Sequence, residues 1–146
     1  MTGFRFLLAD GLSDSEIYLK INKCIPGDVP LYVMHIMTAE NSQIVGQITL
    51  QVAPARKVYY IGHIGYRVEE AFRGNNYALK ACRLMFEQAR KHKMKELIIT
   101  CNPDNLPSRR TLEKLGGKLT GIVPVPQWHE LYHKGDRDKC VFVFKI

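Results

Sequence analysis

The chain has 146 residues, with 21 Lys and Arg against 14 Asp and Glu, which gives a formal net charge of +7. This length suits one domain, residues 1–146, that buries its own core, and the charge favours an anionic partner such as a phosphorylated cofactor, nucleic acid or an acidic protein. No stretch approaches 18 uninterrupted apolar residues, so we expect neither a signal peptide nor a membrane partner. The four cysteines are widely spaced and form no C-x-x-C pair, so we expect buried thiols in a cytoplasmic protein.

The N-terminal third predicts a strand, a helix and a hairpin. Phe4 to Ala9 is apolar enough for a first strand. Ser13 to Cys24 opens with the S-x-x-E spacing of a capping box and repeats apolar residues at helical intervals, so we expect a helix there. Leu31 to Thr38 and Ile44 to Val52 are rich in β-formers and are separated by a polar turn, which predicts an antiparallel pair.

The middle of the chain predicts a β-α-β unit. Tyr59 to Val68 continues the sheet, and Asn76 to His92 is amphipathic with a helical period. Glu96 to Cys101 is the next strand. Because a helix connects the two strands, we expect them to pair in parallel through a right-handed crossover.

The last third predicts a short helix, two strands and a loop. Asn105 to Gly116 has a good N-cap at its start and a glycine at its end, and strands are expected near Lys118 to Val123 and Lys139 to Phe144. The residues between these strands are irregular and include Trp128, His129 and Tyr132. We interpret this loop as a candidate substrate wall.

Arg73 to Ala78 follows a predicted strand and opens the long helix, where free backbone N–H groups and the positive end of the helix dipole converge. Gly74 lets the backbone approach a ligand, and Asn76 adopts the left-handed conformation at lower cost than most residues. This pattern predicts a phosphate site. The alternative is an ordinary strand-to-helix turn with a basic flank.

The string from Arg73 to Ala78 resembles motif A, Q/R-x-x-G-x-G/A, of the GNAT superfamily of acyl-CoA N-acyltransferases, with Asn76 where a glycine is usual. Asn105-x-x-Ser108 followed by E-K-L-G resembles the family's motif B, with Gly117 in place of the usual aromatic residue. Two segments, Ile64 to Tyr66 and Ser108 to Arg110, resemble sequences in the branch of the family that contains ribosomal-protein N-terminal acetyltransferases.

The resemblance implies an α/β (α+β) GNAT fold, with a mixed, mostly antiparallel central sheet, a splayed parallel strand pair and flanking helices. It also implies acetyl-CoA as co-substrate, with its pyrophosphate on the start of the long helix and its thioester along the edge of Tyr66 to Val68. The implied cofactor-binding residues are Tyr66, Val68, Arg73, Gly74, Asn75, Asn76, Tyr77, Ala78, Asn105 and Ser108.

Direct transfer needs a neutral amine, and His63 is the candidate base because it lies on the strand that leads to the thioester. Strand alternation places His63 on the face opposite Tyr66, so a structural or substrate-binding histidine is the alternative. Glu69 and Glu70 are further candidates, or solvated loop charges. Motif B usually carries a tyrosine that protonates the departing thiolate, and Leu112 stands at that position.

Ser108 is therefore the candidate to protonate or position the sulfur, with Tyr132 as another possibility. No acid is required if the thiolate leaves unaided, since its pKa is near 8.5. Cys101 adjoins the predicted cleft and is interpreted as a buried structural thiol rather than a nucleophile, like Cys24, Cys82 and Cys140. His129 and His133 have the H-x-x-x-H spacing, but we expect the segment that holds them to be an irregular loop and not a helix, so we predict no metal site.

The sequence therefore predicts an N-acetyltransferase that moves an acetyl group from acetyl-CoA to a primary amine of a small molecule, a peptide or a protein N-terminus. We expect no nucleic-acid or membrane partner, and a monomer or homodimer. The alternative is a non-catalytic acyl-CoA-binding or RNA/ribosome-associated module on the same fold, which Leu112 and Asn76 suggest.

Overall fold

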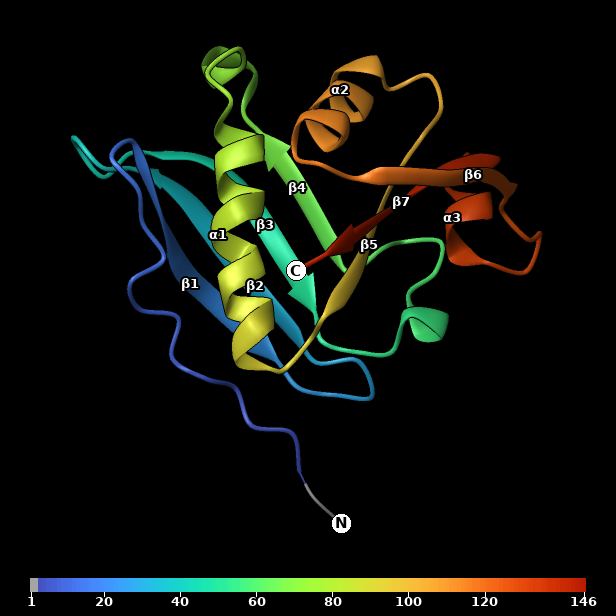
Figure 1. The fold of residues 1–146 in the computed structure, drawn as a ribbon, viewed down its shortest axis with the longest axis horizontal. Coiled ribbons are helices and arrows are strands. Elements are labelled where there is room, and N and C mark those ends of the chain that lie inside the picture. The colour runs from blue at the N-terminus through green and yellow to red at the C-terminus, as the bar shows by residue number, and fades with distance from the viewer. Residues whose placement is uncertain (1–2) are drawn as a thin grey trace.

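The computed structural model describes residues 3–146, which form two antiparallel sheets with helices packed between and beside them (Figure 1). The first sheet has the order β1-β2-β3-β4 and the second has the order β5-β7-β6. The strands are β1 (Ile17–Ile25), β2 (Leu31–Thr38), β3 (Ile44–Gln51), β4 (Ile64–Val68), β5 (Glu96–Cys101), β6 (Lys118–Pro124) and β7 (Asp138–Lys145).

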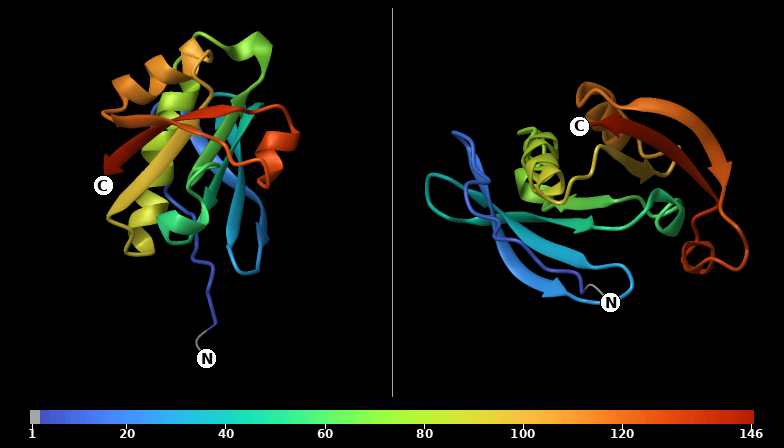
Figure 2. Two further views of the ribbon diagram at one scale, coloured as in Figure 1. Left: turned by 90° about the vertical axis from the view of Figure 1, so that its right-hand side faces the viewer. Right: turned by 60° about the horizontal axis from the view of Figure 1, so that its bottom comes forward.

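The helices connect and cover the sheets. They are η1 (Ala55–Lys57), η2 (Glu70–Phe72), α1 (Tyr77–Lys91), α2 (Leu106–Lys114) and α3 (Glu130–His133). Helix α1 packs across the first sheet, and α2 lies next to α1 and β5 (Figures 1 and 2). One hydrophobic core joins these layers, with fully buried side chains from both sheets and α1, such as Ile48, Met85 and Phe142.

Most of the predicted elements are confirmed. The hairpin of β2 and β3, the long helix α1, the short helix α2 and the strands β5, β6 and β7 lie within a residue or two of their predicted bounds. Strand β4 is shorter than predicted because Tyr59–His63 forms a turn, in which the Gly62 N–H donates to the Val58 carbonyl at 2.6 Å.

The prediction of a helix over Ser13 to Cys24 is wrong, because this segment is strand β1. Ile17 and Leu19 alternate into the core with 0% and 4% exposure, and β1 pairs with β2 along its length. The apparent capping box is instead a turn in which Asp14 Oδ1 accepts the N–H groups of Glu16 and Ile17 at 2.7 and 2.8 Å.

The prediction of a strand at Phe4 to Ala9 is also wrong. Side chains rather than a sheet edge satisfy the backbone here. The Leu7 N–H donates to Tyr32 Oη at 2.7 Å, and Gln88 Nε2 donates to the Leu7 carbonyl at 3.2 Å. The segment therefore crosses the molecule as an extended chain.

Strands β4 and β5 do not form the parallel ladder that the sequence predicts. They meet at the start of β4, where the His63 N–H donates to the Ile98 carbonyl at 2.8 Å. Beyond that point β4 pairs with β3, and β5 pairs with β7. The two strands therefore splay apart and leave a gap between the sheets.

Gly117 leaves room for an aromatic side chain from another strand. A Cβ at Gly117 would overlap the ring of Phe144 on β7, which is 3% exposed. The ring therefore fills the core beside the end of α2. The aromatic residue that the family pattern places at position 117 is thus compensated from a distant part of the chain.

Candidate functional site

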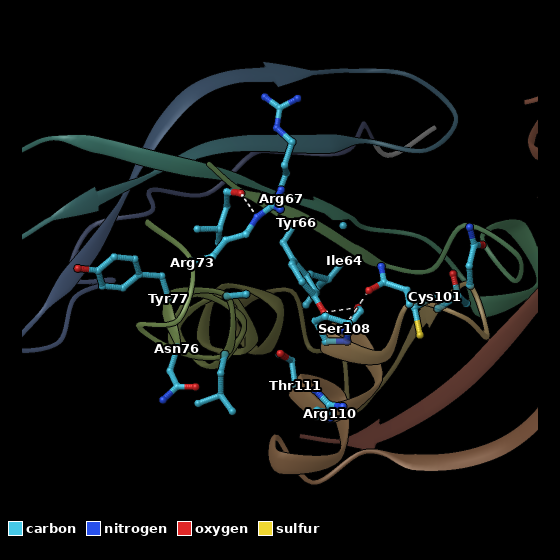
Figure 3. A pocket seen from close by; sticks show the side chains of 18 of the residues that line it. Ile64, Tyr66, Arg67, Arg73, Asn76, Tyr77, Cys101, Ser108, Arg110 and Thr111 are labelled. Atoms are coloured by element: carbon cyan, nitrogen blue, oxygen red, sulfur yellow. Dashed lines mark hydrogen bonds between the residues drawn. The ribbon is translucent and has the colours of Figure 1, made fainter. Parts of the chain in front are cut away.

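A cavity of about 780 Å³ opens where β4 and β5 splay (Figure 3). Its walls are the exposed edge of β4, the end of β5, the first turn of α1 and one side of α2. The predicted site residues Tyr66, Val68, Arg73, Gly74, Asn76, Tyr77, Ala78, Asn105 and Ser108 all line it. Asn75 does not line the cavity, and its Nδ2 donates to the Phe72 carbonyl at 2.9 Å within the same turn.

The backbone of β4 presents hydrogen-bonding groups to this cavity. The Glu69 N–H, just beyond β4, donates to the Val45 carbonyl at 2.8 Å. Because backbone groups alternate between the two edges of a strand, those of Tyr66 and Val68 point away from β3. The cavity is on that side. The Val68 carbonyl accepts Arg73 Nε at 3.2 Å, which holds the arginine against the end of the strand.

The turn before α1 has the conformation of an anion cradle. Gly74 and Asn76 both have left-handed backbone angles, with φ of 89° and 59°. The Asn76 side chain makes no capping bond, and its carbonyl accepts the Lys80 N–H at 3.0 Å. The N–H groups of the first helical turn thus have no side-chain cap and face the cavity with the positive end of the helix dipole.

The charged residues that line the cavity are all basic: Arg67, Arg73, Arg110, Lys114 and Lys139. Among residues 3–146, no carboxylate or imidazole side chain lines it. The cavity therefore favours an anion. It also disfavours the protonation of an amine that enters it.

Tyr66 and Ser108 meet in the middle of the cavity wall (Figure 3). Tyr66 Oη is 2.6 Å from Ser108 Oγ, and burial raises the pKa of the Tyr66 phenol. Asn105 Oδ1 accepts the Ser108 N–H at 3.2 Å and caps α2. These bonds fix the serine hydroxyl at the start of the helix, next to the free edge of β4.

The structure does not support His63 as the catalytic base. Its side chain is 2% exposed and does not line the cavity. Nε2 lies 2.8 Å from the Ala53 carbonyl, to which it donates, and Nδ1 accepts the Ile98 N–H at 3.0 Å. Burial lowers the pKa of His63, so the ring stays neutral with no free nitrogen. The structural role, which strand alternation indicated, fits this geometry.

The other candidates for proton transfer also lie outside the cavity. Glu69 and Glu70 are exposed, and Glu69 Oε1 is 3.6 Å from Arg67. The ring of Tyr132 stacks on Arg137, with the guanidinium carbon 3.9 Å from the ring centroid. Leu112 is fully buried in the core, so no acid stands at the position of the family's tyrosine.

Cys101 is 5% exposed at the edge of the cavity. Burial, and then the neighbouring Cys140, raise the pKa of the Cys101 thiol to about 11. A thiol that stays protonated at neutral pH is a weak nucleophile. The structural interpretation of Cys101 therefore fits its surroundings.

Several lining residues were not identified from the sequence, among them Thr100, Asn102, Thr111 and Lys114. Arg110 and Lys114 are four residues apart on α2, so they share one face of the helix. That spacing, counted from the cap at Asn105, was a usable signal.

The family model described as an acetyltransferase (GNAT) domain matches residues 11–118. The chain belongs to the GNAT acetyltransferase family. The GNAT match covers β1 to α2 and so includes the edge of β4, the end of β5, the first turn of α1 and the side of α2 that line the cavity. Comparison with curated protein sequences gives no match.

Solved structures share the fold of this GNAT domain. An acetyltransferase of the GNAT family from Bacillus anthracis is 19% identical, with a TM-score of 0.63 over 77% of this chain and 65% of its own. The microcin C7 self-immunity acetyltransferase MccE, in complex with acetyl-CoA and AMP, is 23% identical, with a TM-score of 0.62 over 80% of this chain and 61% of its own.

The ribosomal L7/L12 α-N-protein acetyltransferase RimL, in complex with coenzyme A, is 20% identical, with a TM-score of 0.62 over 80% of this chain and 62% of its own. The chain thus spans about three-fifths of the length of such structures. At these identities the likeness establishes the fold and leaves the substrate open.

No helix within residues 3–146 combines the length and apolar composition needed to span a membrane. No group of three or more His, Cys, Asp or Glu side chains in the same residues is arranged to hold a metal ion.

Proposed function

We propose that this GNAT domain is an N-acetyltransferase that moves the acetyl group of acetyl-CoA directly to a primary amine. The observation that carries the proposal is a single cavity that joins an uncapped helix start to the free edge of β4 and has only basic charged side chains. Such a cavity matches an extended ligand with phosphates at one end and amide groups along its length.

The residues of the cavity fit acetyl-CoA part by part. The N–H groups of Arg73 to Ala78 would hold the pyrophosphate, and the backbone of Tyr66 and Val68 would bind the pantetheine amides and the acetyl carbonyl. Arg110 and Lys114 would meet the phosphate at the nucleotide end. The solved complexes of MccE with acetyl-CoA and of RimL with coenzyme A support this choice of ligand.

The proposed reaction is a direct acyl transfer, in which the protein supplies hydrogen bonds. The amine nitrogen attacks the thioester carbon, the C–S bond breaks, and the nitrogen loses its proton to water. Backbone N–H groups on β4 polarise the carbonyl. Ser108 donates a hydrogen bond to the departing sulfur, and the Tyr66 hydroxyl at 2.6 Å orients the serine. The thiolate, with a pKa near 8.5, leaves as the anion and takes its proton from water.

The acceptor amine must lose its proton without a base from the cavity wall. For a lysine with a pKa of about 10.4, deprotonation at pH 7 costs roughly 4 to 5 kcal/mol, against about 1 kcal/mol for an α-amine. The basic side chains that line the cavity favour the neutral form of either amine, because they repel an ammonium ion, but the lysine still has the larger cost. We therefore assign the acceptor to weakly basic amines such as the α-amine of a peptide or protein.

The buried Leu112 favours a second candidate, a module that binds acyl-CoA without efficient chemistry. The two candidates predict different outcomes in one pair of measurements. Acetyl-CoA is titrated into the protein by calorimetry, and thiol release is then followed over a panel that includes glycinamide, phenylalaninamide and N-α-acetyl-lysine amide.

The proposed enzyme binds acetyl-CoA and releases CoA faster with α-amines than with the lysine derivative. Binding without amine-dependent release would support the module. A protein that does not bind acetyl-CoA would refute both, and salt-sensitive binding of RNA would then be expected.

A further inference from the structure

Four aromatic side chains form a cluster on the surface at one end of the cavity: Tyr59, Tyr60, Trp128 and His129. The ring of Tyr60 lies edge-to-face against the other three rings of the cluster. The distances between ring centroids are 5.1 Å to Tyr59, 6.5 Å to Trp128 and 5.3 Å to His129. The two contributing segments, before β4 and beside α3, lie side by side in both ribbon figures (Figures 1 and 2).

The cluster is held in place by hydrogen bonds to the rest of the site. Thr100 Oγ1, on the cavity wall, donates to the Tyr60 carbonyl at 2.8 Å. His129 Nδ1 accepts the Leu131 N–H at 3.1 Å and caps α3. The aromatic groups are therefore presented by a fixed backbone and not by a free loop.

The cluster is continuous with the cavity. Ile61 follows Tyr59 and Tyr60 in the chain and lines the cavity, and Leu131 does the same after Trp128 and His129. In Figure 3, Asn76 and Tyr77 lie on one side of Ser108, and Cys101 lies on the other. Since Thr100 precedes Cys101, the cluster adjoins the end of the cavity opposite to the anion cradle.

Two side chains of the cluster, and Ile61 beside it, are exposed to solvent. Trp128 is 76% exposed, and Tyr59 and Ile61 are 37% and 39% exposed. Contiguous exposed apolar groups of this kind are unfavourable in water and mark sites that bind a partner. Tryptophan and tyrosine contribute most to binding because they bury a large area with little loss of side-chain entropy.

We infer that the aromatic cluster binds a large apolar or aromatic side chain carried next to the acceptor amine. This inference rests on the proposed function, which places the cofactor at the other end of the cavity. The acceptor is then a weakly basic primary amine with a bulky apolar neighbour, such as a peptide whose first residues are apolar. The amine enters past Ile61 and Leu131, and the apolar group stays on Tyr60 and Trp128.

Trp128 provides a direct test, because it is the single tryptophan of the chain. Its fluorescence is recorded while phenylalaninamide or glycinamide is titrated into the full chain saturated with CoA. Phenylalaninamide is expected to move the emission to shorter wavelength, and glycinamide is expected to leave it unchanged. In acetyl transfer, KM for phenylalaninamide is expected to be roughly 10- to 100-fold below that for glycinamide.

Substitutions separate this surface from the rest of the site. Tyr60→Ala keeps the fluorescent residue and is expected to remove most of the preference for phenylalaninamide, and Trp128→Ala is expected to do so in the kinetic assay. KM for acetyl-CoA should stay the same in both. Ile122→Ala, which shortens an apolar side chain 52% exposed on β6 outside the cavity, is the matched control and should change neither value.

The outcomes are distinct. Equal KM values for the two amides, or an unchanged Trp128 emission in a protein that binds CoA, would overturn the inference and leave the proposed function standing. A protein that does not bind CoA would overturn the proposed function itself.

Discussion

Tyr66 Oη lies 2.6 Å from Ser108 Oγ, so a side chain of β4 and a side chain of α2 meet across the cavity between the two sheets. Burial raises the pKa of the Tyr66 phenol, which therefore remains protonated at neutral pH and can donate to the serine. The two hydroxyl groups lie together in the centre of the cavity wall.

Ser108→Ala is expected to lower kcat by roughly 10- to 100-fold and to change KM for acetyl-CoA little, because the hydroxyl acts on the departing sulfur. Tyr66→Phe keeps the ring and should give a smaller loss, since Ser108 retains its own proton. Steady-state kinetics measure both. Ser15→Ala, at an exposed position outside this cavity, is the control, and an unchanged kcat in Ser108→Ala would exclude a role for the hydroxyl in catalysis.

His63→Gln is expected to leave the pH profile of kcat unchanged and to weaken the pH dependence of stability. Burial holds the pKa of folded His63 below the unfolded value of about 6.5, so protons bind more tightly to the unfolded chain. Stability is therefore complete above about pH 6.5 and is lost as the pH falls from there through the folded pKa.

Urea unfolding at several pH values between 7.5 and 5 measures this effect. Glutamine keeps one donor and one acceptor and does not titrate. Part of the pH dependence should persist in the variant, because burial also lowers the pKa of His92. If the acidic fall in the pH profile of kcat disappeared in His63→Gln, the histidine would act in proton transfer.

Asn76→Gly is expected to preserve or tighten the binding of CoA, because the left-handed backbone at φ of 59° suits glycine and the side chain makes no capping bond. Asn76→Val should weaken binding and cost about 1 to 2 kcal/mol of stability, since a β-branched residue is strained there. Calorimetric titration with CoA and thermal unfolding distinguish the two variants. Equal affinity for CoA in the original protein and both variants would show that the turn before α1 does not bind the cofactor.

Arg110→Ala is expected to raise the Kd of CoA by roughly three- to tenfold, because a charge-assisted contact to phosphate is lost from a partly hydrated position. The loss should be smaller with dephospho-CoA and at high salt. Arg83→Ala on the exposed face of α1, outside the cavity, is the matched control. If both variants behave alike, the arginine on α2 acts only through the net charge of the protein.

Local patterns predicted the elements that dominate the fold, and long-range pairing decided the rest. The amphipathic period of Tyr77–Lys91 and the glycine and asparagine around α2 are local signals, and both helices are confirmed. Ile17–Ile25 has apolar residues that satisfy both a helical and a two-residue period, and pairing with β2 selects the strand. Such a choice depends on a partner outside the segment.

Most residues of the candidate site that the sequence predicts line the cavity, but the surroundings of their side chains could not be predicted. The anion cradle and the cap at Asn105 follow from residue types at fixed spacings, and both line the cavity. The surroundings of His63 depend on Ala53 and Ile98, which no local pattern connects to it. The aromatic cluster likewise joins segments almost 70 residues apart, Tyr60 and Trp128.

The splay of β4 and β5 has a mechanical consequence. The two sheets are built by separate ladders, and their strands meet at the bond from the His63 N–H to the Ile98 carbonyl. A cofactor in the cavity would contact β4 on one side and α2 on the other, and would hold the two together. At a concentration 100 times its Kd it would add about 2.7 kcal/mol to the stability of the fold, so the thermal midpoint should rise steadily with added CoA.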